Sequence, residues 1–482
     1  MFRSRCSISL ALLCLFSIGI AKAYASYGDV DVATSDDIAR NVMSFGLNLM
    51  QKINANYNKI SLFSPLSIMS ALAMLLLGSK GRSYSELAHL FGQLDVVKLH
   101  DQFGLMIRDA QQPYIKTTSP LRQLDPWHSD SLSKSLRGYP VNRNESQILY
   151  VANGLFVQQG FTINPNYRQA LEQIYNSEVY PVDFERDPNT AKQKINSWAK
   201  LQTVNKITEL ISDDIDTSTR MILANTLYFK AKWEIDFIGG ETKKREFYPN
   251  GVGSQPVLLV ESMAGVGAHP YYEDRELNCH IIGIPYHGNM STMYVIQPLE
   301  SSVEKLKRLQ EELNTDIIDK MISKMKRTSA IVVFPKMHIT ESLNLREYLR
   351  SMGIGGIFTP IQYDLSMIVT KDERFLRYPS DAIESLRNLD AQRAAQPKPP
   401  TPRAELIISE IVHKVDFNVD EKGTEAAAAT AAFLKKSGPE VNFIVNTPFI
   451  LLVRNDLTHL PLFYGIINEP PSQKLKFTYY GK

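Results

Sequence analysis

An alanine-rich stretch near the C-terminus constrains the fold more than any other feature of this chain. Residues 421–433 read Glu-Lys-Gly-Thr-Glu-Ala-Ala-Ala-Ala-Thr-Ala-Ala-Phe and lie between two β-like segments, residues 407–419 and 449–454. Alanine has the highest helix propensity, so the run taken alone favours an exposed helix. The flanking strands favour another interpretation, in which the stretch can itself become a strand.

Read as a strand, the stretch has one face that a sheet could bury. Successive side chains of a strand point to opposite faces. One face is small and uncharged: Thr424, Ala426, Ala428 and Thr430. The other face holds Glu425, Ala427, Ala429 and Ala431. With Gly423 as a backbone hinge at its start, the pattern predicts a loop that can slide between the strands of an existing sheet without burying a charge.

Residues 421–430 resemble the reactive-loop hinge of inhibitory serpins, a family of serine protease inhibitors. Further segments are similar to that family and occur in the family's order: 63–68 (Phe-Ser-Pro-Leu-Ser-Ile), 77–87, 223–233, 334–336 (Phe-Pro-Lys), 349–358, 409–414 and 463–470. The resemblance runs from about residue 45 to residue 470, apart from two insertions.

The resemblance implies an α+β fold in one domain over residues 26–482, although 482 residues alone would suggest two or three domains. We expect the serpin fold, with three β-sheets, about eight or nine helices and an exposed reactive-centre loop at about residues 421–447. The family also implies a monomer.

The N-terminus has the pattern of a secretory signal peptide over residues 1–25. Arg3 and Arg5 precede an apolar run at residues 8–20, and small residues at 21–23 and 23–25 offer cleavage sites. A membrane anchor is the alternative, but the run is short for a span. We therefore expect a secreted, extracellular protein without a membrane anchor.

Removal of the signal peptide would leave one cysteine. Cys6 and Cys14 lie inside it, so Cys279 would remain alone and no intrachain disulfide could form. Asn144 and Asn289 begin Asn-x-Ser patterns and are candidate glycosylation sites.

Two segments depart from the family pattern, at about residues 111–146 and 374–404. Both are rich in proline and polar residues, and we expect disordered, exposed loops. The first carries scattered basic residues, so it could bind a glycosaminoglycan, although a solvated loop explains the charges as well. A net charge of +2 over the whole chain gives no argument for nucleic-acid binding.

Three residues match family positions at the centre of the main sheet, namely Ser64, Asn225 and His413. The resemblance implies that hydrogen bonds between Asn225 and His413 hold closed the gap through which the loop inserts. A lone histidine in an apolar strand is otherwise an ordinary satisfied core residue, and both interpretations hold here.

Three further residues match the top of that sheet. Lys336 and Glu421 match a salt bridge that would restrain entry of the loop, and Trp233 matches a bulky residue packed beneath the opening. The alternatives are a surface ion pair of ~0–1 kcal/mol and an ordinary core aromatic residue.

The sequence gives no sign of an enzyme. It has no Gly-x-Ser-x-Gly elbow, no His-Glu-x-x-His and no phosphate loop. Its histidines look isolated along the chain, so we expect no metal site and no cofactor.

The mechanism that the resemblance implies is suicide inhibition of a serine protease. The protease cleaves the loop, and the freed hinge inserts into the sheet while the protease stays attached as an acyl-enzyme. The resemblance to invertebrate haemolymph serpins suggests an immune or melanisation cascade. The alternative is a non-inhibitory serpin that acts as a carrier, chaperone or storage protein.

The scissile bond follows from counting and from chemistry. The commonest family spacing from Gly423 places the cut after Ser437, and one residue earlier gives Lys436-Ser437. A trypsin-like protease needs a basic residue before the cut, because its specificity pocket holds a carboxylate. We therefore predict Lys436 as the specificity residue, with Lys435 and Ser437 as alternatives. The two lysines could instead only keep the loop soluble.

Overall fold

The computed structural model describes residues 30–111, 124–128, 147–288, 290–359, 365–370, 379–394, 406–421 and 438–474. The helices in these ranges are α2 (Val32–Ile53), α3 (Pro65–Leu77), α4 (Gly81–Leu90), α5 (Val96–Gln111), α7 (Pro165–Tyr175), α8 (Pro188–Gln202), α9 (Val303–Glu312), α10 (Thr315–Ser323), α11 (Arg346–Ser351) and α12 (Ala382–Ala394), with 3-10 turns η1 (Pro126–His128) and η3 (Gly356–Phe358).

The strands are β1 (Ile60–Phe63), β2 (Ile148–Gln158), β3 (Glu178–Val182), β4 (Met221–Lys230), β5 (Lys243–Phe247), β6 (Leu258–Asp274), β7 (Cys279–Pro285), β8 (Ser291–Pro298), β9 (Lys326–Pro335), β10 (Met337–Asn344), β11 (Glu410–Val419), β12 (Val441–Ile444), β13 (Phe449–Asn455), β14 (Pro461–Ile467) and β15 (Gln473–Lys474).

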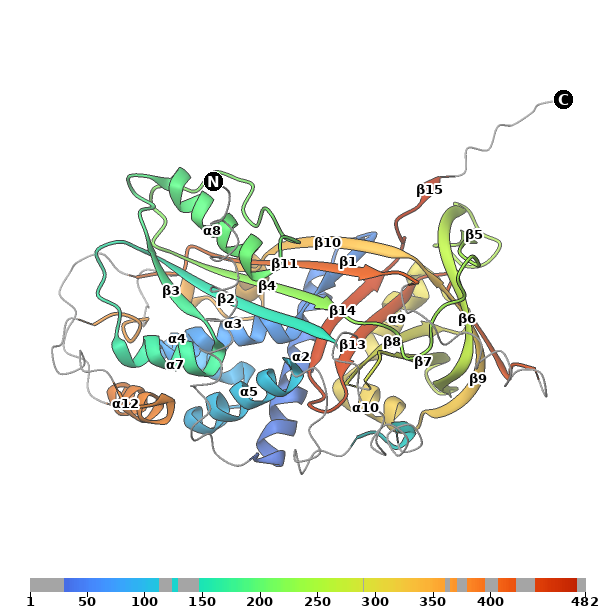
Figure 1. Ribbon diagram of the computed structural model, residues 1–482, viewed down its shortest axis with the longest axis horizontal. Coiled ribbons are helices and arrows are strands. Elements are labelled where there is room, and N and C mark those ends of the chain that lie inside the picture. Colours follow the sequence, from blue (N-terminus) through green and yellow to red (C-terminus); the bar gives the residue numbers. More distant parts are fainter. Residues whose placement is uncertain are drawn as a thin grey trace, which may run out of the picture.

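A five-stranded sheet in the order β10-β11-β4-β2-β3 forms one layer of the molecule (Figure 1). Its two middle strands, β4 and β11, are parallel neighbours. Helices α3, α5 and α7 lie below this sheet in Figure 1, and α8 lies above it. The remaining ten strands form a second sheet at the other end of the molecule.

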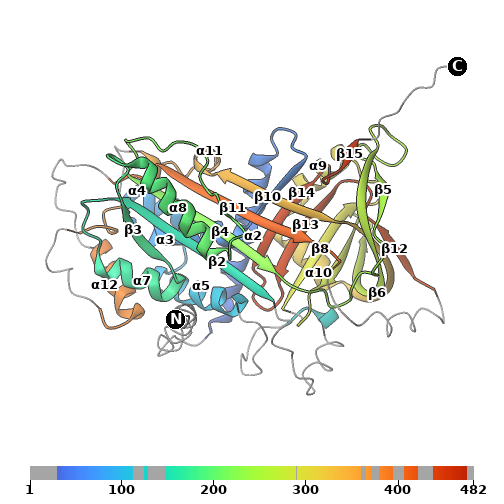
Figure 2. The ribbon, with the colours of Figure 1, turned by 45° about the horizontal axis from the view of Figure 1, so that its top comes forward.

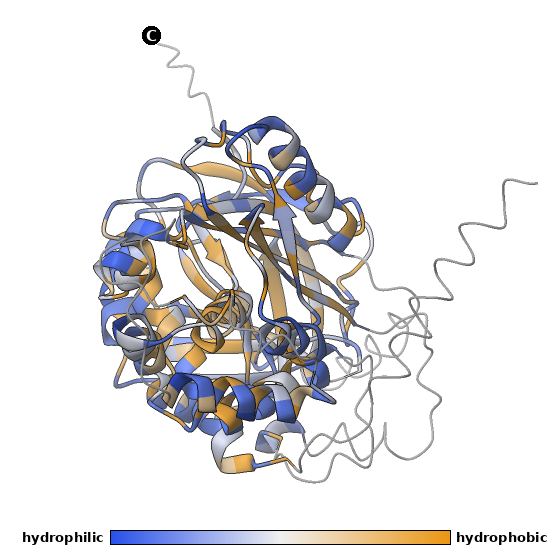
Figure 3. Ribbon diagram, turned by 90° about the vertical axis from the view of Figure 1, so that its left-hand side faces the viewer, coloured by the Kyte–Doolittle hydropathy of each residue, from blue (hydrophilic) through white to orange (hydrophobic). Residues whose placement is uncertain are grey.

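Helix α3 forms the centre of the main core. All of its 13 residues are buried, so the helix is apolar on every side rather than amphipathic. Ser64 caps its N-terminus, where the hydroxyl oxygen accepts a hydrogen bond from the Ser67 N–H. Pro65 occupies the first turn, where no N–H is needed. The hydropathy colouring in Figure 3 shows apolar strands enclosed by helices with hydrophilic outer sides.

A second, smaller core lies on the outer face of the five-stranded sheet. Ile195 and Trp198 of α8 pack there with Phe156 of β2 and Ala224 of β4. Figure 2 shows α8 in front of β2 and β4. The sheet is therefore buried on both faces along this part of its strands.

The sheets connect differently from the expectation of three separate sheets. Strand β6 is 17 residues long, pairs with β5 and β9 along most of its length and pairs with β7 at its end. One strand thus serves two sets of neighbours, and the described strands form two hydrogen-bonded sheets.

The second insertion, expected to be disordered over residues 374–404, contains helix α12 in its described part. This raises the described α-helices to ten, against the eight or nine expected. Ala382, Leu386 and Leu389 are buried and recur at helical spacing, so α12 has an apolar side to pack against α7 and α5. The prolines that argued against a helix begin at Pro397, after α12 ends.

The first insertion also departs from the expectation of a disordered loop at residues 111–146. Its described residues include η1, where Trp127 and His128 are 4% and 1% exposed. Separately, no helix in the described part of the chain is long and apolar enough to cross a membrane.

Candidate functional site

The parallel pair formed by β4 and β11 is the candidate site, and we call it the seam. The register joins Glu410 through Asp416 of β11 to Ile222 through Tyr228 of β4, with His413 opposite Asn225. Residues 417–419 of β11 continue beyond this ladder and pair with β10. The seam is therefore closed over most of its length and ends before β11 does.

The direction of the strands decides what the seam can accept. Strand β11 leads directly to Glu421, where the predicted loop begins. A segment that turned back from this point would run antiparallel to both β4 and β11. Antiparallel pairing needs only a short turn, whereas two parallel neighbours need a long crossover connection.

At the middle of the seam, His413 links both strands to helix α3. The Ser64 backbone N–H donates a 3.1 Å hydrogen bond to His413 Nε2, and His413 Nδ1 contacts Asn225 Oδ1. Because Nε2 is an acceptor, the proton of a neutral ring lies on Nδ1, which donates to Asn225. Burial lowers the pKa of His413 to about 3, so the ring is neutral at pH 7.

Asn225 is satisfied on all sides. Its Oδ1 also accepts a 2.9 Å hydrogen bond from the Ser67 hydroxyl, and its Nδ2 donates to the Ser67 carbonyl and to Asn153 Oδ1. Asn153 Nδ2 in turn donates to the Ser70 hydroxyl at 2.9 Å. Opening the seam would leave these buried polar groups in need of new partners.

At the loop end of the seam, a second set of contacts holds the chain just before the predicted loop. The Trp233 indole Nε1–H donates a 2.8 Å hydrogen bond to the Asp420 carbonyl. Lys336 Nζ lies 3.0 Å from Glu421 Oε2. The Thr242 hydroxyl donates a 2.6 Å hydrogen bond to Glu421 Oε1.

The electrostatics of this end are those of a partly exposed ion pair. Burial opposes ionisation of Glu421, but hydrogen bonds that include those from Thr242 and Lys336 outweigh it and hold the pKa of Glu421 below its ordinary value. The same carboxylate raises the pKa of Lys336. The side chain of Lys336 is 39% exposed and that of Glu421 is 24% exposed. Solvent therefore screens their attraction, and the pair contributes only ~0–1 kcal/mol.

Helix α8 and the segment after it cover the outer face of the seam. Val412 of β11 and Ile222 of β4 pack beneath them in the smaller core. Lys414 Nζ donates a 2.5 Å hydrogen bond to the Glu209 carbonyl. A strand entering the seam must therefore displace this cover as well as the contacts of His413.

The structure places six predicted residues at the seam, including the first hinge residue, Glu421. Ser64, Asn225 and His413 meet at its middle, whereas Lys336 and Trp233 lie at its loop end, where Lys336 contacts Glu421.

Sequence reasoning missed Ser67, Asn153 and Thr242. Ser67 lies inside the matched segment 63–68 and could have been found there. Asn153 joins the site because β2 pairs with β4, and Thr242 joins it through its hydrogen bond to Glu421. In both cases the partner is distant in sequence.

The other predicted sites lie outside the described residues. They are the remaining hinge positions Gly423, Thr424, Glu425, Ala426, Ala427, Ala428, Ala429 and Thr430, the bond Lys436-Ser437, the glycosylation candidates Asn144 and Asn289, and the signal peptide at residues 1–25.

Comparison with known proteins gives consistent results. A family model described as serpin (serine protease inhibitor) matches residues 40–470. "Serine protease inhibitor 28Dc" of Drosophila melanogaster is 50% identical over 93% of this chain and 82% of that protein. "Intracellular coagulation inhibitor 2" of Tachypleus tridentatus is 28% identical over 90% of this chain and 91% of that protein.

Solved structures agree on the fold. Uncleaved ovalbumin matches with a TM-score of 0.70 at 22% identity, covering 90% of this chain and 100% of that one. The mouse protein-Z dependent protease inhibitor matches with a TM-score of 0.69 at 22% identity, covering 90% of this chain and 98% of that one.

Proposed function

The chain belongs to the serpin family of serine protease inhibitors, and from that premise we propose that it is a secreted suicide inhibitor of a trypsin-like serine protease. The observation that carries the proposal is the seam. Two parallel neighbouring strands are held together by side-chain hydrogen bonds, and one of them leads directly into the alanine-rich hinge at Glu421.

The proposed reaction starts as ordinary proteolysis. The protease serine attacks the carbonyl carbon of Lys436 and forms an ester, and the amine of Ser437 leaves as a new N-terminus. The freed hinge then enters the seam as a strand antiparallel to β4 and β11. The attached protease is carried away from the loop end before water hydrolyses the ester.

Insertion is supported by what the seam offers to a new strand. The backbone N–H and C=O groups of the loop would gain partners on both sides, and the inward hinge residues would be buried without a charge. The cost is the rearrangement around His413 and Asn225 and the displacement of α8 from the outer face. Insertion of a loop into a sheet is a switching transition known for serpins as a class.

The target class rests on Lys436. A trypsin-like specificity pocket accepts lysine or arginine, and Ser437 is small enough to follow the cut. Lys436→Ala is expected to abolish the covalent complex with trypsin-like proteases, and Lys435→Ala is the matched control on the neighbouring lysine. Attachment of the natural target at another residue would refute this specificity while leaving the inhibitory mechanism standing.

Secretion and pathway belong to the same proposal. The charged and apolar pattern of residues 1–25 supports export, and N-terminal sequencing of the protein released by expressing cells tests it. A relative named "Intracellular coagulation inhibitor 2" supports a role in a protease cascade, which we propose is of immune or melanisation type. The extracellular part of the proposal rests on residues 1–25 alone.

The decisive test is the formation of a covalent complex. Incubation with trypsin-like, chymotrypsin-like and elastase-like proteases should give a detergent-stable complex with the first class, and mass spectrometry should locate the ester at Lys436. Complete cleavage of the loop by all three classes without any complex would instead support the non-inhibitory alternative, a carrier, chaperone or storage serpin.

A further inference from the structure

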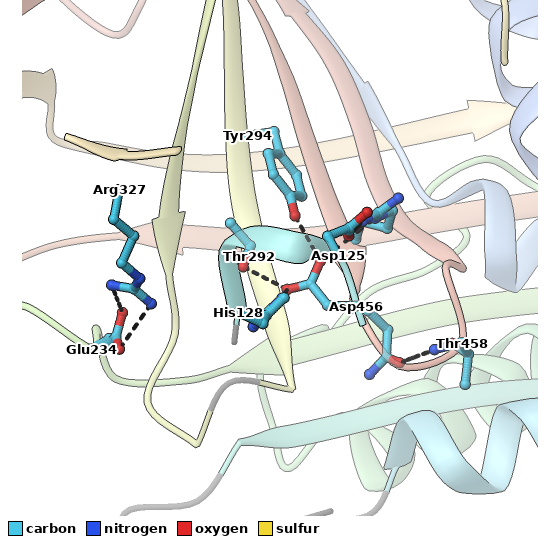
Figure 4. Close-up of polar contacts among 10 residues, drawn as sticks. Asp125, His128, Glu234, Thr292, Tyr294, Arg327, Asp456 and Thr458 are labelled. Carbon is cyan, nitrogen blue, oxygen red and sulfur yellow. Dashed lines mark hydrogen bonds and ion pairs between the residues drawn. The ribbon is translucent and has the colours of Figure 1, made fainter. Parts of the chain in front are cut away.

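A buried polar cluster lies where the first insertion touches the second sheet. Turn η1 brings Asp125 and His128 together, because His128 N–H donates to the Asp125 carbonyl at 2.9 Å and residues three apart in a 3-10 turn lie on one side. Asp456 faces them from the turn between β13 and β14 (Figure 4). His128 is 1% exposed and Asp456 is 0% exposed.

Neighbouring side chains fix the orientation of Asp456. The Thr292 hydroxyl donates a 2.6 Å hydrogen bond to its Oδ2, and the Tyr294 hydroxyl donates a 2.8 Å hydrogen bond to its Oδ1. Figure 4 shows both contacts, with His128 beside the same carboxylate. Two hydroxyl donors on one carboxylate are the kind of outer contact that orients a metal ligand.

We infer that Asp125, His128 and Asp456 form a binding site for one zinc ion. One ligand atom from each residue lies within 4.8 Å of the other two. His128 Nε2 is 3.4 Å from Asp456 Oδ2, which is longer than the usual N–H···O distance. Two ligands of a tetrahedral zinc ion, each bonded at ~2.0–2.2 Å, lie roughly 3.3–3.5 Å apart.

The donor set selects among metals. One imidazole nitrogen with two carboxylate oxygens suits zinc, whereas calcium and magnesium prefer oxygen ligands alone. The three protein ligands leave the fourth tetrahedral position to a water molecule, as in zinc sites that keep an open position.

The charges of the cluster favour a bound cation despite the presence of an arginine. Arg454 Nη2 contacts Asp125 Oδ2, and its Nε lies 3.5 Å from Asp456 Oδ1. Arg454 thus lies at oxygen atoms other than Asp456 Oδ2, the one that faces His128. With His128 neutral as a zinc ligand, the buried Asp456 and the partly exposed Asp125 together carry one more negative charge than Arg454 supplies. Asp319, 3.7 Å from Arg454, lies at the rim, where Arg40 also pairs with it at 3.4 Å.

A zinc ion bound here would link the first insertion to the second sheet, because its ligands come from both. Asp125 and His128 belong to the insertion, and Asp456 belongs to the turn after β13. The site is independent of Lys436 and of the seam, so the proposal stands or falls separately from protease inhibition. Spacing along the chain could not reveal it, because Asp456 lies more than 300 residues beyond His128.

The test measures metal on the intact secreted chain. Protein stripped of metal and dialysed against zinc at neutral pH should retain one equivalent of zinc. Cobalt(II) in its place should give the intense visible absorption of a tetrahedral site. His128→Gln removes the nitrogen ligand and should weaken zinc binding at least about tenfold. His459→Asn is the matched control, since His459 lies beside Arg454 but outside the three ligands.

Asp125→Asn provides a second variant if His128→Gln does not fold. It should weaken zinc binding in the same way, since asparagine keeps the size of Asp125 and can still accept a hydrogen bond from Arg454 but removes the anionic ligand. Retention of no zinc by the wild-type chain would overturn the inference. So would zinc binding that neither His128→Gln nor Asp125→Asn weakens, because the ion would then be held elsewhere.

Discussion

His413 joins two strands and one helix through its two ring nitrogens. One nitrogen accepts from the backbone of Ser64 at the start of α3, and the other donates to Asn225 on β4. The same ring lies at the middle of the seam, opposite Asn225 in the register. A single neutral side chain therefore helps to close the seam, and the state of its proton matters for stability.

The protonation of His413 predicts how stability depends on pH. Its pKa falls from an ordinary 6.5 to about 3 in the folded chain, because burial disfavours the charged ring. The unfolded chain therefore binds a proton first as the pH falls. The stability that the neutral His413 ring contributes is present in full above pH 6.5 and is lost progressively between pH 6.5 and about pH 3. At pH 5 the loss is about 2 kcal/mol.

His413→Gln isolates this contribution, because glutamine can donate and accept but does not titrate. Heat-unfolding midpoints at a fixed scan rate should fall less steeply between pH 7 and pH 5 for the variant than for the wild type. Other buried histidines, such as His100 and His269, affect both proteins equally. Parallel curves for the two proteins would contradict the assignment.

At the scale of elements, helix α12 was not predicted from the sequence, whereas elements of the site were. The seam strands and the contact of Lys336 with Glu421 could be anticipated, because these residues lie in segments that match the serpin family. Helix α12 could not, because the prolines after it dominated the composition of the segment. Its place depends on a partner: Arg393 donates to the carbonyls of Leu77 and Ser79 at the end of α3.

The contact of Arg393 predicts that α12 stabilises the core. Its guanidinium satisfies carbonyl groups that the end of α3 leaves unpaired, and it lies 4.6 Å from the centre of the Tyr84 ring. Arg393→Ala should destabilise the protein by roughly 1.5–3 kcal/mol, the range for hydrogen bonds from a charged group. Heat unfolding at a fixed scan rate measures the loss. Arg387→Ala, at an exposed position of the same helix, should change the midpoint little.

The hinge gives the second prediction at this scale. Thr424→Arg would require a charged side chain to enter the interior of the sheet, at a cost of roughly several kcal/mol. Insertion should slow, so that hydrolysis of the ester overtakes it and the variant becomes a substrate. Glu425→Arg places the same side chain on the opposite face and should still trap protease. Equal stoichiometry of inhibition for both variants would show that the faces are wrongly assigned.

At the scale of the whole molecule, the fold was predictable because its matched segments span residues 45–470 in order. The matched segments did not predict contacts between residues that are distant in sequence and meet only in the folded chain. Asn153 reaches Asn225 across strands, and η1 brings Asp125 and His128 to the turn holding Asp456. Such contacts depend on three-dimensional packing, and no local pattern of residues encodes them.

The seam finally predicts that cutting the loop makes the whole protein more resistant to heat. The uncut chain holds β4 and β11 as parallel neighbours, a pairing slightly less stable per residue than antiparallel pairing. An inserted strand would pair antiparallel with both of them. It would also remove the loop's backbone groups from water. The heat-unfolding midpoint should rise by roughly 5 °C if insertion adds about 5 kcal/mol, because a chain of 482 residues has an unfolding entropy of about 1 kcal/mol per kelvin.

Calorimetry before and after limited proteolysis within residues 422–437 measures this change at one scan rate. The cleaved Thr424→Arg variant is the internal control, because its cut is the same but its insertion is hindered. Its midpoint should rise less than that of the cleaved wild type. If the cleaved wild type unfolds at the same temperature as the uncut protein, the loop does not enter the seam. The chain would then have the serpin fold without the loop insertion that inhibition requires. A carrier, chaperone or storage role would explain that result better.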